Sequence, residues 1–478
     1  RRDEFFTVRN NKNNSPQKNN RNERQGAARP PQPLPNAKTL AAMAQRFMDF
    51  TAMYRKYFQT SHLNAAEKAR GYLTGLLMKS PRKNMERMEE YVQDYDYQNQ
   101  QQFLSDSPWD HAELTKRIGR DVDQLLGGSE SALLIDESGF RKKGVKSAGA
   151  ARQWNGRDGK VDNCQVGVFA ALVNHKGASL VNSRLYLPES WTDDDERCRL
   201  AKIPEDKREY QSKTQMAWEM IEEAVGNGLR FSSVNFDALY GSTPWLLRKV
   251  EDAGLLFFGD VRTNQHVFVE DPKPYLPRRK RKTGRKFTQL RSRNEGVKIE
   301  DLFANASSQQ WKRVKVREST KGTITVTACY QRVWLWDGEE KQARQWWAVC
   351  YREGRDGELK YFLSNAAETV SLVTLLRKHA MRFWIERCFQ DGKTSIGMGD
   401  YQARGWIAWH HHMALVMLAM LFMLRERIRY KTTIELLSCQ DIIELLNVYI
   451  PRKDTTVEAV IQNMNQRHRK RRAAIEYA

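Results

Sequence analysis

The period of the hydrophobic positions predicts helices in the N-terminal part of the chain. Across residues 37–128, apolar side chains recur at steps of three and four, as at Leu40, Met43 and Phe47. This spacing is typical of one buried helix face. Basic residues are interspersed among them, so we expect an all-helical DNA-binding domain. A second interpretation stays open, in which the helices are a packing module whose charges are merely solvated.

After Gly127-Gly128 the pattern changes to short apolar runs that end at glycine, proline or asparagine, which is typical of strands. Three strands in succession, followed by alternating helices and strands, predict a mixed α/β sheet over residues 129–270. The predicted strands are residues 131–140, 164–174, 179–187, 231–236 and 255–261, and the predicted helices are residues 212–225 and 243–253.

A second stretch of strands interrupts this alternation at residues 271–364. It begins with several prolines and a run of five basic residues, the basic loop, which consists of Arg278, Arg279, Lys280, Arg281 and Lys282. Four runs then have the pattern of successive strands, at residues 311–316, 323–336, 345–351 and 359–364. We interpret this stretch as a β-rich insertion inside the α/β domain.

Helical periodicity returns at about residue 369. It predicts the second part of the α/β domain over residues 365–430, with a break at 397–405. The remaining residues, 431–478, are expected to hold one more helix at 434–448 and then a basic tail that contains the stretch 467–472.

The composition indicates a class of partner. The 478 residues include 79 Lys and Arg against 58 Asp and Glu, a formal net charge of +21, which favours a polyanion such as nucleic acid. Residues 1–36 are polar and basic and are expected to form a disordered arm. The longest purely apolar run, Met413–Leu424, has 12 residues and is too short to span a membrane. The six cysteines form no Cys-x2-Cys pair, so we expect buried side chains rather than a zinc site.

Two aspartates stand where an α/β sheet commonly carries chemistry. Asp136 directly follows an apolar run at 133–135, where an isolated buried charge is costly. Asp237 follows the predicted strand 231–236 at its exit into a loop. Active sites of α/β proteins are often built at the carboxyl ends of strands. Taken singly, either aspartate also has the ordinary interpretation of a helix cap or a turn residue.

A third candidate lies on the helix predicted after residue 369. About 100° of rotation per residue places four polar side chains on one face, namely His379, Arg382, Glu386 and Lys393. The expected buried stripe consists of Leu372, Val373, Leu376, Ala380 and Phe383. A solvated stripe with an Arg382–Glu386 pair has the same spacing, so the pattern alone leaves both interpretations open.

In order and context, Asp136, Asp237 and Glu386 resemble the Asp-Asp-Glu triad of DDE transposases from bacterial insertion sequences. Two longer blocks also resemble one subgroup of these transposases, residues 149–168 and 186–191. The resemblance extends from about residue 103 to residue 400.

One branch of these transposases carries the signature Tyr-x2-Arg-x3-Glu-x6-Lys. The segment Arg382-x3-Glu386-x6-Lys393 matches its last three residues, and His379 stands at the tyrosine position. This departure puts in doubt the DNA contact that the branch assigns to the tyrosine.

The resemblance implies a ribonuclease-H-like core with the β-rich insertion between the second aspartate and the glutamate. It implies divalent-metal-dependent cleavage at transposon ends and strand transfer into target DNA. Asp136, Asp237 and Glu386 would hold two Mg²⁺ ions, for which Mn²⁺ substitutes, because such ions prefer carboxylate oxygens.

Other residues become DNA contacts under the same resemblance. Arg382 and Lys393 would bind phosphates, and His379 would take the place of the tyrosine. Lys142 and Lys143, just after the first aspartate, and the basic loop are further candidates. The resemblance also implies that aromatic side chains hold a base flipped out of the DNA. The candidates are the tryptophans of the insertion, Trp334, Trp336, Trp346 and Trp347. The alternative for each is that it only fills the core of the insertion.

The expected partners are double-stranded DNA, as transposon end and as target, and a second copy of the chain in a homodimer on paired ends. The expected location is the bacterial cytoplasm, at the nucleoid. Two other functions remain as alternatives: a domesticated DNA-binding protein without catalysis, and a structure-selective nuclease of the same fold that cuts without joining.

Overall fold

A computed structural model describes residues 37–60, 63–156, 158–278, 287–319, 322–434, 437–453 and 456–476. The predicted basic arm, residues 1–36, lies outside these ranges. So does most of the basic loop, namely Arg279, Lys280, Arg281 and Lys282.

A ten-stranded mixed sheet forms the centre of the fold. Its first strands are β1 (Ala132–Arg141), β3 (Lys160–Asn174), β4 (Gly177–Leu185), β5 (Ser233–Phe236) and β6 (Leu256–Val261). β3 runs antiparallel between β1 and β4, while β5 and β6 follow parallel on the other side of β1. The order β4-β3-β1-β5-β6 fits the expected ribonuclease-H-like core.

The strands predicted as an insertion extend this same sheet. β6 pairs antiparallel with β12 (Lys360–Ser364), and the sheet continues through β11 (Arg344–Glu353), β10 (Gly322–Leu335) and β9 (Lys312–Ser319). The sequence pattern did not predict β2 (Ala151–Asn155), which pairs with the start of β3. A separate two-stranded sheet consists of β7 (His266–Val267) and β8 (Val297–Lys298).

Helices cover both faces of the core strands. α13 (Phe383–Asp391) and α14 (Trp406–Tyr430) pack on one face, and Phe169 of β3 contacts a ring from each, Phe389 and Trp409. On the other face lies α8 (Lys213–Gly226), which begins at a reciprocal Ser212–Gln215 capping box. Glu137 pairs with Lys213 of α8 at 2.6 Å, so its side chain points away from that of Asp136, as strand alternation requires.

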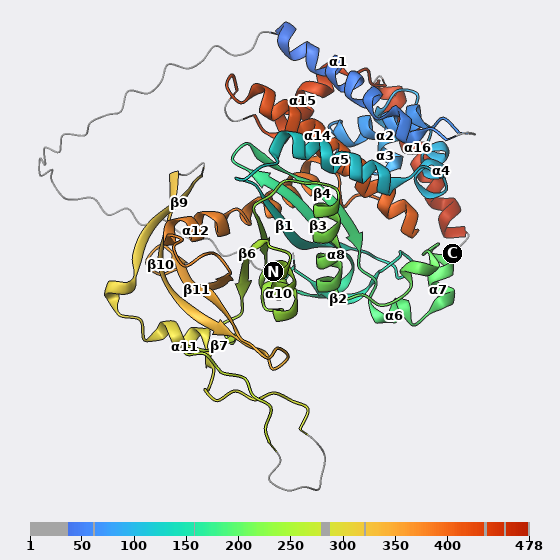
Figure 1. Ribbon diagram of the computed structural model, residues 1–478. Helices are drawn as coiled ribbons and strands as arrows, with labels where there is room; N and C mark the ends of the chain where they lie inside the picture. Colours follow the sequence, from blue (N-terminus) through green and yellow to red (C-terminus); the bar gives the residue numbers. More distant parts are fainter. Residues whose placement is uncertain are drawn as a thin grey trace, which may run out of the picture.

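The N-terminal region is helical, as predicted, but the structure does not confirm it as a separate domain. Its helices are α1 (Ala37–Met53), α2 (Ala66–Leu77), α3 (Met85–Tyr91), α4 (Tyr97–Ser105) and α5 (His111–Leu126). They share one hydrophobic core with the sheet, and Figure 1 places them against α14 and α15 (Cys439–Tyr449). Phe47 of α1 packs edge-on against Phe422 of α14, with the ring centroids 5.2 Å apart.

α14 is the central helix of this core. By length and composition it is the one helix among the described residues that could cross a membrane, yet 94% of its most apolar window is buried inside the protein. His410, His411 and His412 are buried with it. Elsewhere in the core, all six cysteines are free and buried, as predicted.

The predicted basic tail is instead a helix, α16 (Val457–Glu476). Its basic stretch packs on α3, where Arg467 pairs with Glu90 and Lys470 pairs with Glu89 at 3.3 Å. The sequence pattern missed this helix because its face carries charge rather than a continuous apolar stripe. The remaining helices are α6 (Glu189–Thr192), α7 (Asp195–Leu200), α9 (Ala238–Gly241), α10 (Pro244–Asp252), α11 (Ile299–Ala304) and α12 (Leu372–Ala380), with short 3₁₀ turns at Arg55–Phe58, Glu205–Lys207 and Ser308–Gln310 and a π-helical turn at Gly392–Ile396.

Candidate active site

Three aspartates form a row across three neighbouring parallel strands: Asp136 lies within β1, Asp237 directly follows β5, and Asp260 lies near the end of β6. Ile135 of β1 pairs in register with Phe236 of β5, and Phe236 pairs with Gly259 of β6. The residue that follows each of these three positions is an aspartate: Asp136 after Ile135, Asp237 after Phe236 and Asp260 after Gly259. We call these three aspartates the acidic row. The fold therefore brings the two predicted aspartates together and adds one that the sequence analysis did not single out.

Asp136 is a buried carboxylate, only 9% exposed. Its Oδ1 accepts a hydrogen bond of 2.7 Å from the backbone N–H of Glu137, and its Oδ2 lies 3.6 Å from Nη1 of Arg382. Burial, and after it the nearby carboxylate of Asp237, raises the pKa of Asp136 well above its usual range. The positive charge near Asp136 is therefore not sufficient to stabilise its ionised form.

Asp237 has two roles at once. It is the N-cap of α9, where Oδ1 accepts from the backbone N–H groups of Leu239 and Tyr240 at 2.9 and 3.3 Å. Burial raises its pKa, although Arg382 acts in the opposite direction. The capping interpretation is thus confirmed, and it does not exclude a functional one, because the cap fixes this carboxylate beside Asp136.

Arg382 links the aspartate row to Glu386. Its Nε donates to Oδ2 of Asp260 at 2.9 Å, and its Nη2 lies 3.4 Å from Oε1 of Glu386. With the contact to Asp136, one guanidinium touches three carboxylates. The side chain of Glu386 is 55% exposed. It lies on the same side of the sheet as the aspartates, and the guanidinium of Arg382 lies between it and Asp136.

The helix that carries these residues is not continuous. α12 ends at Ala380 and α13 begins at Phe383. Between them the backbone tightens to hydrogen bonds three residues apart, from Arg382 N to His379 O and from Ile385 N to Arg382 O, at 3.1 and 3.2 Å. A tightened stretch followed by a π-helical turn is common at functional sites. The four predicted residues therefore do not lie on one continuous helix: His379 is on α12, Arg382 is in the break, Glu386 is on α13 and Lys393 is in the π-helical turn.

His379 lies on the buried face of α12, with Leu372, Leu375 and Leu376. Its ring stacks on that of Phe362 at 4.0 Å between centroids, and its Nε2 lies 2.6 Å from Oδ1 of Asp260. The predicted buried stripe was correspondingly wrong at two positions. Val373 and Phe383 are both 38% exposed: the buried face of α12 passes through Leu375 rather than Val373, and Phe383 lies beyond the tightened turn.

The other predicted DNA contacts are spread around the site. Lys393, in the π-helical turn, donates from Nζ to the carbonyl of Gly139 on β1 at 2.9 Å. Lys142 stands over the Tyr401 ring at 3.7 Å, and burial lowers its pKa to about 8. Lys143 and Arg278 are exposed. Lys393 and Lys142 thus flank the far end of β1, beyond Asp136.

Asp260 had a signal in the sequence. It lies near the end of the predicted strand 255–261, after an apolar run, in the same kind of context as Asp136. A search for an acidic residue at the end of every predicted strand of the sheet would have found it.

Asp136 and Asp237 suit a divalent cation. Burial and the neighbouring Asp237 raise the pKa of Asp136, burial raises the pKa of Asp237, and both carboxylates offer hard oxygen ligands. Over the described part of the chain, no three acidic, histidine or cysteine side chains are gathered closely enough to hold one metal ion. Two candidate ligands are therefore adjacent, while Glu386 is turned toward Arg382.

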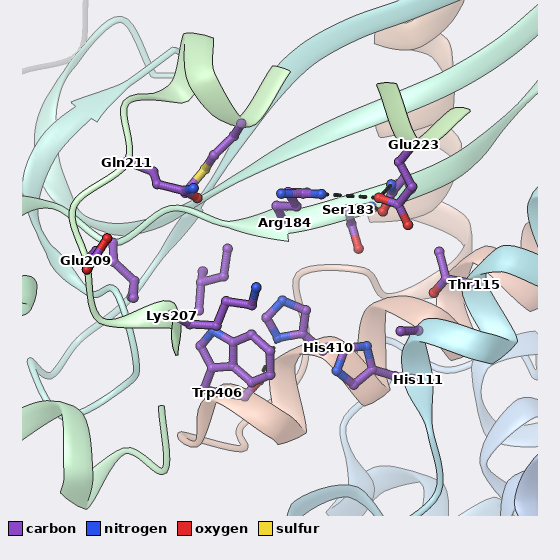
Figure 2. A pocket seen from close by; sticks show the side chains of 15 residues that line it. His111, Thr115, Ser183, Arg184, Lys207, Glu209, Gln211, Glu223, Trp406 and His410 are labelled. Carbon is purple, nitrogen blue, oxygen red and sulfur yellow. Dashed lines mark hydrogen bonds and ion pairs between the residues drawn. The ribbon is translucent and has the colours of Figure 1, made fainter. Parts of the chain in front are cut away.

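A cavity of about 200 Å³ lies elsewhere, between β4 and the first turns of α5 and α14. Figure 2 shows His111, Trp406 and His410 on one side of it and Arg184 with Glu223 on the other. The rings of His111 and His410 stack at 4.9 Å. None of the predicted site residues lines this cavity, so the acidic row does not belong to it.

Comparison with known proteins agrees with this geometry. A family profile described as DDE superfamily endonuclease matches residues 56–323, which contain the three aspartates and end before Glu386. The chain is also 27% identical over 374 residues to a protein of Microchaete diplosiphon described as a probable transposase for insertion sequence element IS701, covering 78% of this chain and 84% of that protein. The match covers more than half of the chain and includes the strands that carry the acidic row, and the chain belongs to the DDE superfamily of endonucleases.

Proposed function

We propose that the protein is a transposase that cleaves DNA at the ends of a mobile element and transfers the cut strand into target DNA. The observation that carries this proposal is the acidic row: Asp136 and Asp237 are side by side, and Arg382 links Asp136 to Glu386. The similarity to a probable insertion-sequence transposase supports the same activity.

Asp136, Asp237 and Glu386 would hold the divalent cations, two Mg²⁺ ions with Mn²⁺ as a substitute. Bound cations of this kind activate an attacking hydroxyl and neutralise charge on the phosphodiester. Glu386 is exposed, so its carboxylate is free to turn from Arg382 toward the aspartates. The protein's own part is then to hold these oxygens and to orient the DNA.

Cationic side chains around the row would bind the backbone phosphates. Arg382 offers a planar fork and Lys393 a point charge. Lys142 and Lys143, which directly follow β1, are proposed as further phosphate contacts. His379 is covered by Phe362 and Asp260, so it would act on the substrate through those neighbours rather than through its own ring.

A second cationic surface lies at the base of the basic loop. A cleft there has a volume of about 540 Å³. Its lining includes Lys273, Tyr275, Arg293, Trp334 and Lys341. Cations beside partly exposed aromatic rings suit a nucleic acid backbone and its bases. Of the tryptophans considered for a flipped base, Trp346 and Trp347 are buried, which leaves Trp334 and Trp336 as candidates.

The proposal is tested by incubating the full-length protein with the DNA that flanks its own gene, in Mg²⁺, in Mn²⁺ or in a chelator. We expect cut ends and joined products only with metal. Asp136→Ala, Asp237→Ala and Glu386→Ala should each lose cleavage and keep DNA binding. Asp252→Ala, a matched control at an exposed Arg344 ion pair, should cut like the wild type.

Cleavage that persists in the chelator, or a triad variant that cuts normally, would contradict the proposal. Binding without any cleavage in Mn²⁺ would favour a domesticated DNA-binding protein. Cut ends without joined products would favour a nuclease. Because two element ends must meet for transposition, the proposed assembly on DNA is a homodimer.

A further inference from the structure

Asp260 uses each of its carboxylate oxygens for one partner from the helical segment. Oδ1 lies 2.6 Å from Nε2 of His379, and Oδ2 accepts from Nε of Arg382 at 2.9 Å. Burial alone would raise the pKa of Asp260, but His379 and then Arg382 outweigh it and hold the pKa below its ordinary value. Since an ionised carboxylate only accepts, Nε2 of His379 carries the proton.

The guanidinium of Arg382 is held unequally. Its Nε is bound at hydrogen-bond distance to Asp260, whereas Nη1 and Nη2 lie 3.6 and 3.4 Å from Asp136 and Glu386. The shorter contact acts as an anchor, and the two longer ones are loose ion pairs. The anchor lies on β6, and the loose contacts face two of the three predicted metal ligands, Asp136 and Glu386.

His379 makes the anchor rigid. Its ring is parallel to that of Phe362, with an interplanar angle of 6°, and Tyr351 contacts its edge at 5.3 Å between centroids. A ring fixed in this way fixes the rotamer of the carboxylate that it bonds. Residues from β6, β11, β12 and the α12–α13 turn thus hold one guanidinium in place.

We propose that Asp260 is a positioning residue that holds Arg382 at the edge of the metal site, so that the two loosely paired nitrogens of the fork can leave the metal ligands and bind a substrate phosphate. This inference rests on the proposed function. Neither the family match nor the sequence motif assigns a role to this third aspartate.

The geometry gives a direction for the effect of removing the charge. Without Asp260 the guanidinium has only Asp136, Asp237 and Glu386 as neighbouring anions, and it would pair with them more closely. A cation in that place competes with a divalent metal for the same oxygens. Loss of Asp260 should therefore weaken metal binding, although Asp260 touches no metal in this proposal.

The first test measures Mn²⁺ binding to the DNA-free full-length protein by calorimetry. Asp260→Asn should weaken binding about tenfold relative to the wild type, since one lost charge contact of this kind changes affinity by that order. Asp260→Asn combined with Arg382→Gln should bind Mn²⁺ as well as Arg382→Gln alone, because the competing cation is gone. Asp252→Asn, which removes a charge from an exposed arginine pair, should bind like the wild type.

The second test measures cleavage. Asp260→Asn should raise the Mn²⁺ concentration needed for half-maximal rate and lower kcat, while KM for DNA stays within about twofold. Arg382→Lys lacks the planar fork that can bind Asp260 and a phosphate at the same time. It should likewise lower kcat and raise the Mn²⁺ requirement with little change in KM for DNA. This variant keeps the test usable if Asp260→Asn does not fold.

The outcomes separate the inference from the proposed function. A wild-type protein that binds no Mn²⁺ or cuts no DNA overturns the proposed function itself. A wild type that binds and cuts, with Asp260→Asn equal to it in both assays, overturns only the role of Asp260. A double variant that is additively worse than its two single variants also overturns it, because Asp260 would then not act through Arg382.

Discussion

At the scale of single residues, the acidic row is a place where the fold tolerates an unfavourable charge. Asp136 is buried and Asp237 half-buried beside it, and the loose contact of Arg382 and a few backbone N–H groups do not offset their charge fully. Proteins tolerate such sites when function requires them, at a cost in stability. The cost should be measurable without any substrate.

Asp136→Asn should therefore stabilise the metal-free protein. The folded pKa of Asp136 is raised above the unfolded value of about 3.9, so the folded state binds more protons and loses stability as pH rises above about 4. The melting temperature of the variant should exceed that of the wild type by roughly 2 °C at pH 7, and by less at pH 4.5. Thermal melts in chelator check this, and a wild type that is the more stable at both pH values would contradict it.

Residue by residue, the sequence revealed those site residues whose neighbours are distinctive. Asp136 and Asp237 each follow an apolar run, which can be recognised without coordinates. The partner of His379 could not be foreseen, because Asp260 meets this side chain only once β6 and α12 pack together. Asp260 had a usable signal, but its register with the other two aspartates exists only once the strands are paired.

At the scale of elements, α14 is an unusual core helix because three consecutive histidines are buried in it. Tyr72 lies 2.8 Å from Nδ1 of His412, and Nε2 of His412 lies 3.3 Å from the Met398 carbonyl. Both nitrogens are thus used by a neutral ring. Burial lowers the pKa of His411 to about 4 and that of His412 to about 3.

These histidines predict acid sensitivity. Their folded pKa values lie below the unfolded value of about 6.5, so they contribute stability above pH 6.5 that is lost as pH falls toward 4. Each contributes up to about 1.4 kcal/mol per pH unit in that window. His412→Asn should show a smaller drop in melting temperature between pH 7.5 and 5 than the wild type. His468→Asn, at an exposed position on α16, is the matched control, and an equal drop in all three proteins would contradict this account.

The sequence predicted the individual strands well, but it did not predict which strands are neighbours in the sheet. Every predicted strand from 131–140 to 359–364 corresponds to an observed one. The apolar pattern shows which face of a strand is buried but not which strand lies beside it. For that reason the pattern predicted a β-rich insertion inside the α/β domain but not that its last strand, β12, pairs with β6 of the core.

At the scale of the whole molecule, the N-terminal helices and the sheet form one body. Arg46 of α1 pairs with Glu426 of α14 at 2.6 Å across 380 residues of sequence. Amphipathic spacing predicted that these helices have a buried face, but it does not indicate the partner of that face. A helix that packs on its own sheet and one that belongs to a separate domain have the same pattern.

The fold also brings Asp136, Asp237 and Glu386 to one side of the sheet. The central claim is that these three carboxylates together bind divalent metal ions. The most direct measurement is anomalous diffraction from Mn²⁺ in crystals of the full-length protein with its own element-end DNA. The account predicts Mn²⁺ within about 2.5 Å of carboxylate oxygens of Asp136 and Asp237, with Glu386 turned from Arg382 to bind it as well. Mn²⁺ found only elsewhere, with Glu386 still paired to Arg382, would contradict it.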